Sequence, residues 1–86
     1  MDKTKKILIV DDDLDLQDII KNALEIEGYE VLVANNGQEG LDLLRSQPTN
    51  EISCIILDLM MPIMDGTEML EKLRQDPRLE KIPVII

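Results

Sequence analysis

The sequence predicts an α/β domain built on a parallel sheet, and two observations support that prediction. The runs at residues 7–10 and 55–57 are apolar, continuous and rich in β-branched side chains, which is typical of strands buried in a parallel sheet. Segments with helical periodicity lie between the predicted strands, so that strand and helix alternate along the chain. The length of 86 residues allows one small domain at most.

The first helix is predicted from the spacing of its apolar side chains. One face of a helix would carry Leu16, Ile19, Ile20, Ala23 and Leu24. We expect Asp13 to cap the N-terminus of this helix, with Asp15 and Asp18 close behind, where the helix dipole favours negative charge. Gly28 is expected to end the helix in the C′ position.

The later elements are predicted from the same kinds of signal. We expect a strand at 29–34, a helix at 38–45 after the Asn36-Gly37 turn, a third strand ending at Asp58, a helix at 67–75 ended by Asp76-Pro77, and the start of a fourth strand at 83–86. Leu41 and Leu44 should face inward from the second helix. The apolar stripe of the third helix should consist of Met69, Leu70 and Leu73.

Composition excludes several classes of function. Eighteen acidic residues against nine basic ones give a net charge of −9, which argues against nucleic acid or an anionic membrane as a partner. Tyr29 is the only aromatic residue, so the core must be aliphatic. Cys54 is the only cysteine, which fits a reducing cytoplasm, and we expect it to be a plain core residue. The apolar run after Lys6 is too short for a signal peptide or a membrane span.

Carboxylates follow two of the predicted strands. Asp11, Asp12 and Asp13 follow the run at 7–10, and Asp58 follows the run at 55–57. Ligands of open α/β sheets lie at the carboxyl ends of the strands, so these carboxylates converge if the two strands are neighbours. Carboxylates held together repel and raise each other's pKa, and the sequence therefore predicts a cation site.

Three other interpretations of the acidic residues explain less. The spacing of Asp11, Asp13 and Asp15 is that of an EF-hand loop, but Leu16 stands where Gly is needed and Asn22 where a bidentate Glu is needed. An Asp-x-Asp opening after a first strand weakly resembles phosphatases of the haloacid-dehalogenase type, but it leaves the carboxylate after the third strand without a role. Acidic decoration of a helix N-terminus explains Asp13 and Asp15 but not the carboxylates at the strand end.

A longer motif separates these possibilities. The stretch Asp58-Leu59-Met60-Met61-Pro62-Ile63-Met64-Asp65-Gly66, together with Ile9-Val10-Asp11-Asp12-Asp13, closely resembles the receiver domain of two-component response regulators. The resemblance covers the whole chain and includes Gly37 and the run at 81–86. It implies a flavodoxin-like (CheY-like) parallel sheet with helices on both faces and strand order 2-1-3-4.

The resemblance also implies a role for each site residue. Asp58 would be the phosphoacceptor of a phosphorelay, receiving its phosphoryl group from a sensor histidine kinase or a phosphotransfer protein. Asp12, Asp58 and the carbonyl of Met60 would bind Mg²⁺ directly, and Asp11 would act through metal-bound water. An ionised carboxylate needs no general base to attack phosphorus. Asp65 is expected to cap the third helix rather than to bind metal.

The C-terminal end departs from the family pattern. Receiver domains usually continue through a fourth helix, a fifth strand and a fifth helix, so residues 1–86 are expected to be a partial domain, truncated within the fourth strand. The family's Ser or Thr, its Lys and its switch aromatic residue would lie beyond Ile86. We therefore expect a phosphoacceptor in the cytoplasm rather than an enzyme, one that binds Mg²⁺, is phosphorylated poorly as this fragment and self-associates. The alternatives are a receiver-like assembly module with an idle pocket and, less favoured, a metal-dependent phosphatase.

Overall fold

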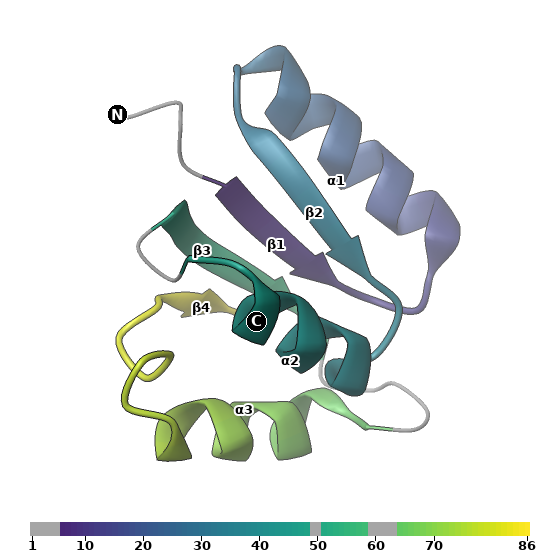
Figure 1. Cartoon of the computed structure of the whole chain (residues 1–86). Coiled ribbons are helices and arrows are strands. Elements are labelled where there is room, and N and C mark those ends of the chain that lie inside the picture. The colour runs from purple at the N-terminus through teal and green to yellow at the C-terminus, as the bar shows by residue number, and fades with distance from the viewer. Residues whose placement is uncertain (1–5, 49–50, 59–63) are drawn as a thin grey trace.

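The computed structural model describes residues 6–48, 51–58 and 64–86, and in that part of the chain it forms a four-stranded parallel sheet with three helices (Figure 1). The elements are β1 (Lys6–Val10), α1 (Leu14–Ile26), β2 (Glu30–Ala34), α2 (Gly37–Ser46), β3 (Ile52–Leu57), α3 (Gly66–Gln75) and β4 (Val84–Ile85). The strand order is β2-β1-β3-β4, which confirms the predicted order 2-1-3-4. None of the helices in the described ranges is long and apolar enough to cross a membrane.

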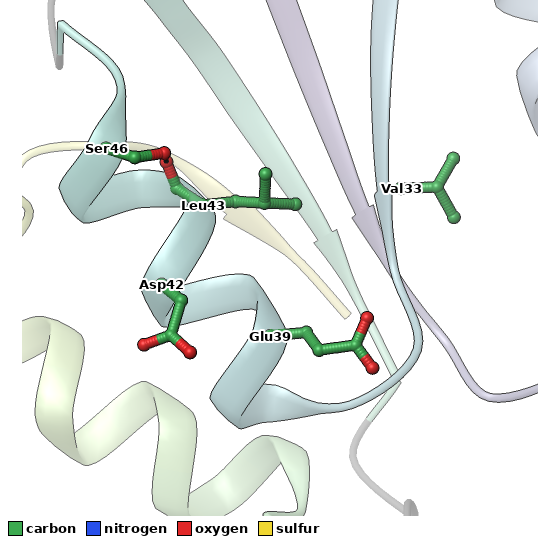
Figure 2. A pocket seen from close by; sticks show the side chains of 5 residues that line it. All are labelled: Val33, Glu39, Asp42, Leu43 and Ser46. Atoms are coloured by element: carbon green, nitrogen blue, oxygen red, sulfur yellow. Dashed lines mark hydrogen bonds between the residues drawn. The ribbon is translucent and has the colours of Figure 1, made fainter.

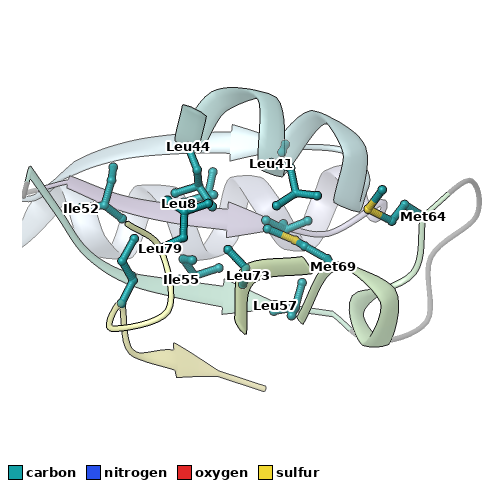
Figure 3. Close-up of a cluster of buried hydrophobic side chains, with 13 residues drawn as sticks. Leu8, Leu41, Leu44, Ile52, Ile55, Leu57, Met64, Met69, Leu73 and Leu79 are labelled. Atoms are coloured by element: carbon teal, nitrogen blue, oxygen red, sulfur yellow. The ribbon is translucent and has the colours of Figure 1, made fainter. Parts of the chain in front are cut away.

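Helices cover both faces of the sheet, but unequally. One face carries α1, beside β2 and β1, and the other carries α2 and α3 (Figure 1). The main core lies between the sheet and the α2–α3 layer, where Leu8, Ile55 and Leu41 are fully buried (Figure 3). Leu44, Met69 and Leu73 are also buried there, which confirms that the predicted stripes of α2 and α3 face inward.

The predicted caps are confirmed. The Asp13 carboxylate accepts hydrogen bonds from the backbone N–H groups of Asp15 and Leu16, at 3.0 and 3.1 Å, and so begins α1. After the helix, Gly28 has a φ of 95°, a conformation that glycine adopts without strain, in the C′ position. Asp65 accepts from the N–H of Glu68 at 2.9 Å and caps α3, as expected.

The predicted apolar stripe of α1 is only partly buried. Leu16 is 41% exposed and Ile19 is 65% exposed, whereas Gln17 is only 5% exposed. Ile20 and Leu24 are half-buried. The helix is therefore turned so that the Gln17 amide, which has hydrogen-bond partners on the strand ends, faces the sheet. Cys54, expected in the core, is half-buried on β3, because it faces the side of the sheet that α1 covers incompletely.

The pairing of β1 with β3 contains one irregularity near its beginning. Lys6 pairs with Ile52 but Ile7 pairs with Cys54, so Ser53 is an extra residue in β3. The Ser53 hydroxyl donates to the carbonyl of Lys6 at 3.2 Å. Beyond this bulge the register is regular as far as the last pair, Val10 with Leu57.

Candidate functional site

The register of the two central strands places the candidate site. Val10 and Leu57 are paired, so the residues that follow them leave the sheet side by side. The N–H of Asp58 donates to the carbonyl of Val10 at 2.9 Å, and the N–H of Asp11 donates to the carbonyl of Ala34 at 3.1 Å. Backbone hydrogen bonds therefore hold the main chain of both residues at the carboxyl edge of the sheet, where α/β folds bind ligands.

Three of the predicted carboxylates form one cluster. Asp11, Asp12 and Asp58 each offer an oxygen, and the three oxygens lie within 4.8 Å of one another. Asp11 is 8% exposed, Asp12 is exposed and Asp58 is half-buried, so the cluster opens to solvent on one side. The fourth candidate, Asp13, is occupied as the cap of α1 and is not in the cluster.

Electrostatics make this cluster unfavourable without a cation. Burial raises the pKa of Asp11, and the neighbouring charges of Asp58, Asp12 and Asp13 raise it further. The backbone N–H of Asp13, which donates to the Asp11 carboxylate at 2.9 Å, acts in the opposite direction but does not outweigh them. A divalent cation placed among the three oxygens would replace this repulsion with attraction.

The donor set fits Mg²⁺. All three groups are carboxylate oxygens, which hard cations prefer, and the solvent-facing side leaves room for the waters that Mg²⁺ retains. Met60, whose carbonyl is an expected ligand, lies outside the described residues, as do Met61, Pro62 and Ile63.

Met64 makes a contact with the start of α2 that sequence reasoning missed. The N–H of Gly37, at the start of α2, donates to the carbonyl of Met64 at 2.9 Å. A Cβ at Gly37 would lie 2.7 Å from that carbonyl oxygen and 2.8 Å from the Met64 Cγ, so only glycine allows this approach. The sequence signal was limited to the turn propensity of Asn36-Gly37.

Gln17 is the second residue near the site that sequence reasoning missed. Its side-chain amide donates to the backbone carbonyl of Asp11 and, at 2.9 Å, to the Asn35 side chain. A signal was present, because Gln17 precedes Ile20 and Leu24 by three and seven residues and so shares their helix face. A polar residue on a buried helix face is informative, since buried amides need partners.

A separate surface pocket lies beside α2 (Figure 2). It measures about 400 Å³ and is lined by Val33, Glu39, Asp42, Leu43 and Ser46. None of the clustered carboxylates lines it, and the Ser46 hydroxyl is already used on the carbonyl of Leu43 at 2.8 Å. The candidate chemistry is therefore in the carboxylate cluster at the strand ends rather than in this pocket.

Fold and site together define a flavodoxin-like α/β domain with a triad of carboxylates, Asp11, Asp12 and Asp58, at the carboxyl edge of its parallel sheet. Residues 7–86 match the response regulator receiver domain, and the chain belongs to that family.

The relatives found by comparison agree with this assignment. The chain is 43% identical over 81 residues to the transcriptional regulatory protein CpxR of Escherichia coli K12, covering 94% of this chain and 32% of the relative. It is 40% identical over 83 residues to the transcriptional regulatory protein SrrA of Staphylococcus aureus NCTC 8325, covering 96% of this chain and 32% of the relative. The chain thus spans about a third of the length of these curated relatives.

Solved structures show the same fold. The N-terminal domain of a response regulator receiver protein from Methanoculleus marisnigri JR1 has a TM-score of 0.84 at 39% identity, covering 92% of this chain and 62% of that one. The chemotaxis response regulator CheY4 of Vibrio cholerae has a TM-score of 0.85 at 30% identity, covering 94% of this chain and 65% of that one.

Proposed function

We propose that this chain is a phosphoacceptor receiver domain in which Asp58 takes a phosphoryl group from a histidine kinase or a phosphotransfer protein, with Mg²⁺ at the cluster. The observation that supports this most directly is the convergence of Asp11, Asp12 and Asp58 oxygens within 4.8 Å of one another at the carboxyl edge of the sheet. Membership of the receiver family supports it independently.

The proposed chemistry follows from the charges at the site. An ionised Asp58 oxygen attacks the phosphorus of a phosphohistidine, a P–O bond forms, and the P–N bond breaks as the leaving imidazole takes up a proton. When bound, Mg²⁺ supplies positive charge that offsets the charge of the phosphoryl oxygens. Asp11 and Asp12 hold that charge beside the nucleophile, with the Met60 carbonyl proposed as a further ligand.

The chain would be the modified partner in this reaction and not an enzyme that turns over a separate substrate. Its relatives are named as transcriptional regulatory proteins, and the chain matches about a third of their length, so we propose that the domain serves as the phosphorylated input of a larger regulator in the cytoplasm.

The test is Mg²⁺ titration of the 86-residue chain by calorimetry, followed by exposure to acetyl phosphate and detection of an acyl phosphate by intact mass. Wild type should bind Mg²⁺ and acquire the adduct slowly. Asp58→Asn should lose the adduct, and Asp12→Ala should lose metal binding. Asp65→Asn is a matched control, because this carboxylate caps α3 and lies outside the cluster.

Two results would contradict the proposal. A wild-type chain that binds no Mg²⁺ and forms no adduct would favour an assembly module with an idle pocket. Release of inorganic phosphate from added phosphoesters, at many turnovers per chain, would instead favour a metal-dependent phosphatase.

A further inference from the structure

The side chain of Gln17 links α1 to the ends of two strands. It is 5% exposed, and its amide nitrogen donates to the backbone carbonyl of Asp11 and to the Asn35 side-chain oxygen at 2.9 Å. The carbonyl of Ala34 lies 3.4 Å from the same nitrogen. One buried amide therefore contacts backbone that follows β1 and the last residue of β2.

The contact with the Asp11 carbonyl bears directly on the carboxylate cluster. That carbonyl belongs to the planar peptide joining Asp11 to Asp12, so fixing its orientation constrains the backbone of both residues. The preceding peptide is fixed as well, because the N–H of Asp11 donates to the carbonyl of Ala34 at 3.1 Å. Two of the three clustered carboxylates thus depend on one short stretch of backbone, held by β2 on one side and by Gln17 on the other.

We infer that Gln17 is a positioning residue for the cation site, and this inference rests on the proposed function. The carboxylates of Asp11, Asp12 and Asp58 repel one another without a cation. Repulsion favours any backbone movement that separates them, and the Gln17 amide opposes that movement. Without the Gln17 hydrogen bond the carboxylates would move apart in the metal-free protein. Part of the binding free energy of Mg²⁺ would then be used to bring them together again, so the affinity for Mg²⁺ would fall.

The experiment compares Mg²⁺ affinity in wild type and Gln17→Met by calorimetric titration. Methionine keeps the length and much of the volume of glutamine but donates no hydrogen bond. We expect the dissociation constant to rise about tenfold, the lower end of what loss of a partner of a metal ligand usually produces. Gln38→Met is the matched control, because that exposed amide donates to Asp42 on its own helix α2, at 3.0 Å. The Mg²⁺ affinity of this variant should equal that of wild type.

A second measurement separates positioning from general stabilisation. The thermal midpoint of each metal-free variant is compared with that of Ile52→Val, a core substitution at the opposite end of β3 from the site. Ile52→Val should lower the midpoint without changing Mg²⁺ affinity. If Gln17→Met lowers the midpoint and leaves the affinity unchanged, Gln17 only fastens α1 to the sheet and the inference is wrong.

The remaining outcomes also decide the matter. If Gln17→Met does not fold, Gln17→Asn replaces it, because its amide is one methylene too short to reach the Asp11 carbonyl; wild-type affinity in that variant would overturn the inference. Failure of the wild-type chain to bind Mg²⁺ would overturn the metal site itself, and with it the inference. Normal binding by wild type and Gln17→Met alike would overturn the inference alone.

Discussion

The two faces of the sheet differ in how they are packed and in what they contribute. On the α2–α3 face, aliphatic and Met side chains from both helices and three strands form a continuous buried cluster (Figure 3). On the α1 face, Leu16 and Ile19 remain exposed, while the polar side chain of Gln17 is buried. The first face supplies most of the stability that packing provides. The second face supplies the hydrogen bond from Gln17 to the backbone of Asp11, one of the three clustered carboxylate residues.

The largest expected effect tests this division directly. Leu41→Ala removes a fully buried side chain from the α2–α3 face and should lower the free energy of unfolding by about 2–5 kcal/mol. Leu16→Ala, the same change on α1, should cost under about 1 kcal/mol, because that side chain is already partly in water. Urea unfolding of the two variants measures both values, and equal losses would refute the difference between the faces.

A smaller effect is expected where the α2–α3 face meets the site. Gly37→Ala should lower the free energy of unfolding by about 1–3 kcal/mol, because its Cβ would collide with the backbone carbonyl of Met64. Gly40→Ala should cost less, since the added Cβ would meet side-chain atoms of Met69 and Val10, 2.9 and 3.0 Å away, and the Met69 end can move. Urea unfolding ranks the two variants, and the reverse order would show that the Met64 contact is not rigid.

A smaller effect again is expected from Asp11, whose ionisation makes the free energy of unfolding depend on pH. The folded-state pKa of Asp11 is raised above its ordinary value of 3.8, so folding favours its protonated form. This contribution to stability is fully present below the ordinary pKa and is lost as the pH rises through the folded-state pKa. Asp11→Asn should therefore raise the metal-free free energy of unfolding at pH 7 by about 0.5 kcal/mol and remove this part of the pH dependence. Urea titrations at pH 4 and pH 7 without metal test this, and a larger gain at pH 4 than at pH 7 would contradict it.

The smallest stability change is expected on the exposed part of the α1 face. Ile19→Lys should alter the free energy of unfolding by no more than about 0.5 kcal/mol, because Ile19 is largely exposed. Exposed aliphatic side chains favour association, so wild type should self-associate at high concentration and this variant should do so less. Sedimentation velocity of both chains measures the difference. A wild-type chain that stays monomeric would contradict this prediction, because the exposed aliphatic side chains of α1 would then not drive association.

Local patterns predicted the strands and the caps, whereas the acidic cluster also needed the strand order that the family resemblance implied. Continuous β-branched runs give buried parallel strands, and adjacency of β1 and β3 then brings Asp11 and Asp58 together. The caps at Asp13 and Asp65 follow from side-chain chemistry within three residues of sequence. Helix starts were less accurate, since α2 begins at Gly37 and α3 at Gly66, each one residue before the predicted start.

The missed features depend on contacts between distant parts of the chain. The apolar pattern of α1 gave Leu16 an inward position, but hydrogen bonds to the ends of β1 and β2 turn Gln17 inward instead. The contact of Gly37 with Met64 joins two turns whose separation only the tertiary fold determines. The helix periodicity places Gln17 on the face of Ile20 and Leu24 but does not name its partners, and the Gly37 contact has no periodic signal at all.

The extra residue Ser53 in β3 has a consequence at the opposite end of that strand. If the pairing of Lys6 with Ile52 continued without the bulge, Val10 would face Ile56, and Asp58 would come one residue later relative to Asp11. Such a slip would also turn Ile55 and Leu57 away from the buried cluster, since alternate residues of a strand face opposite sides. One inserted residue thus sets both core packing and carboxylate alignment, so under the proposed function Mg²⁺ affinity would report whether the central strands have paired correctly.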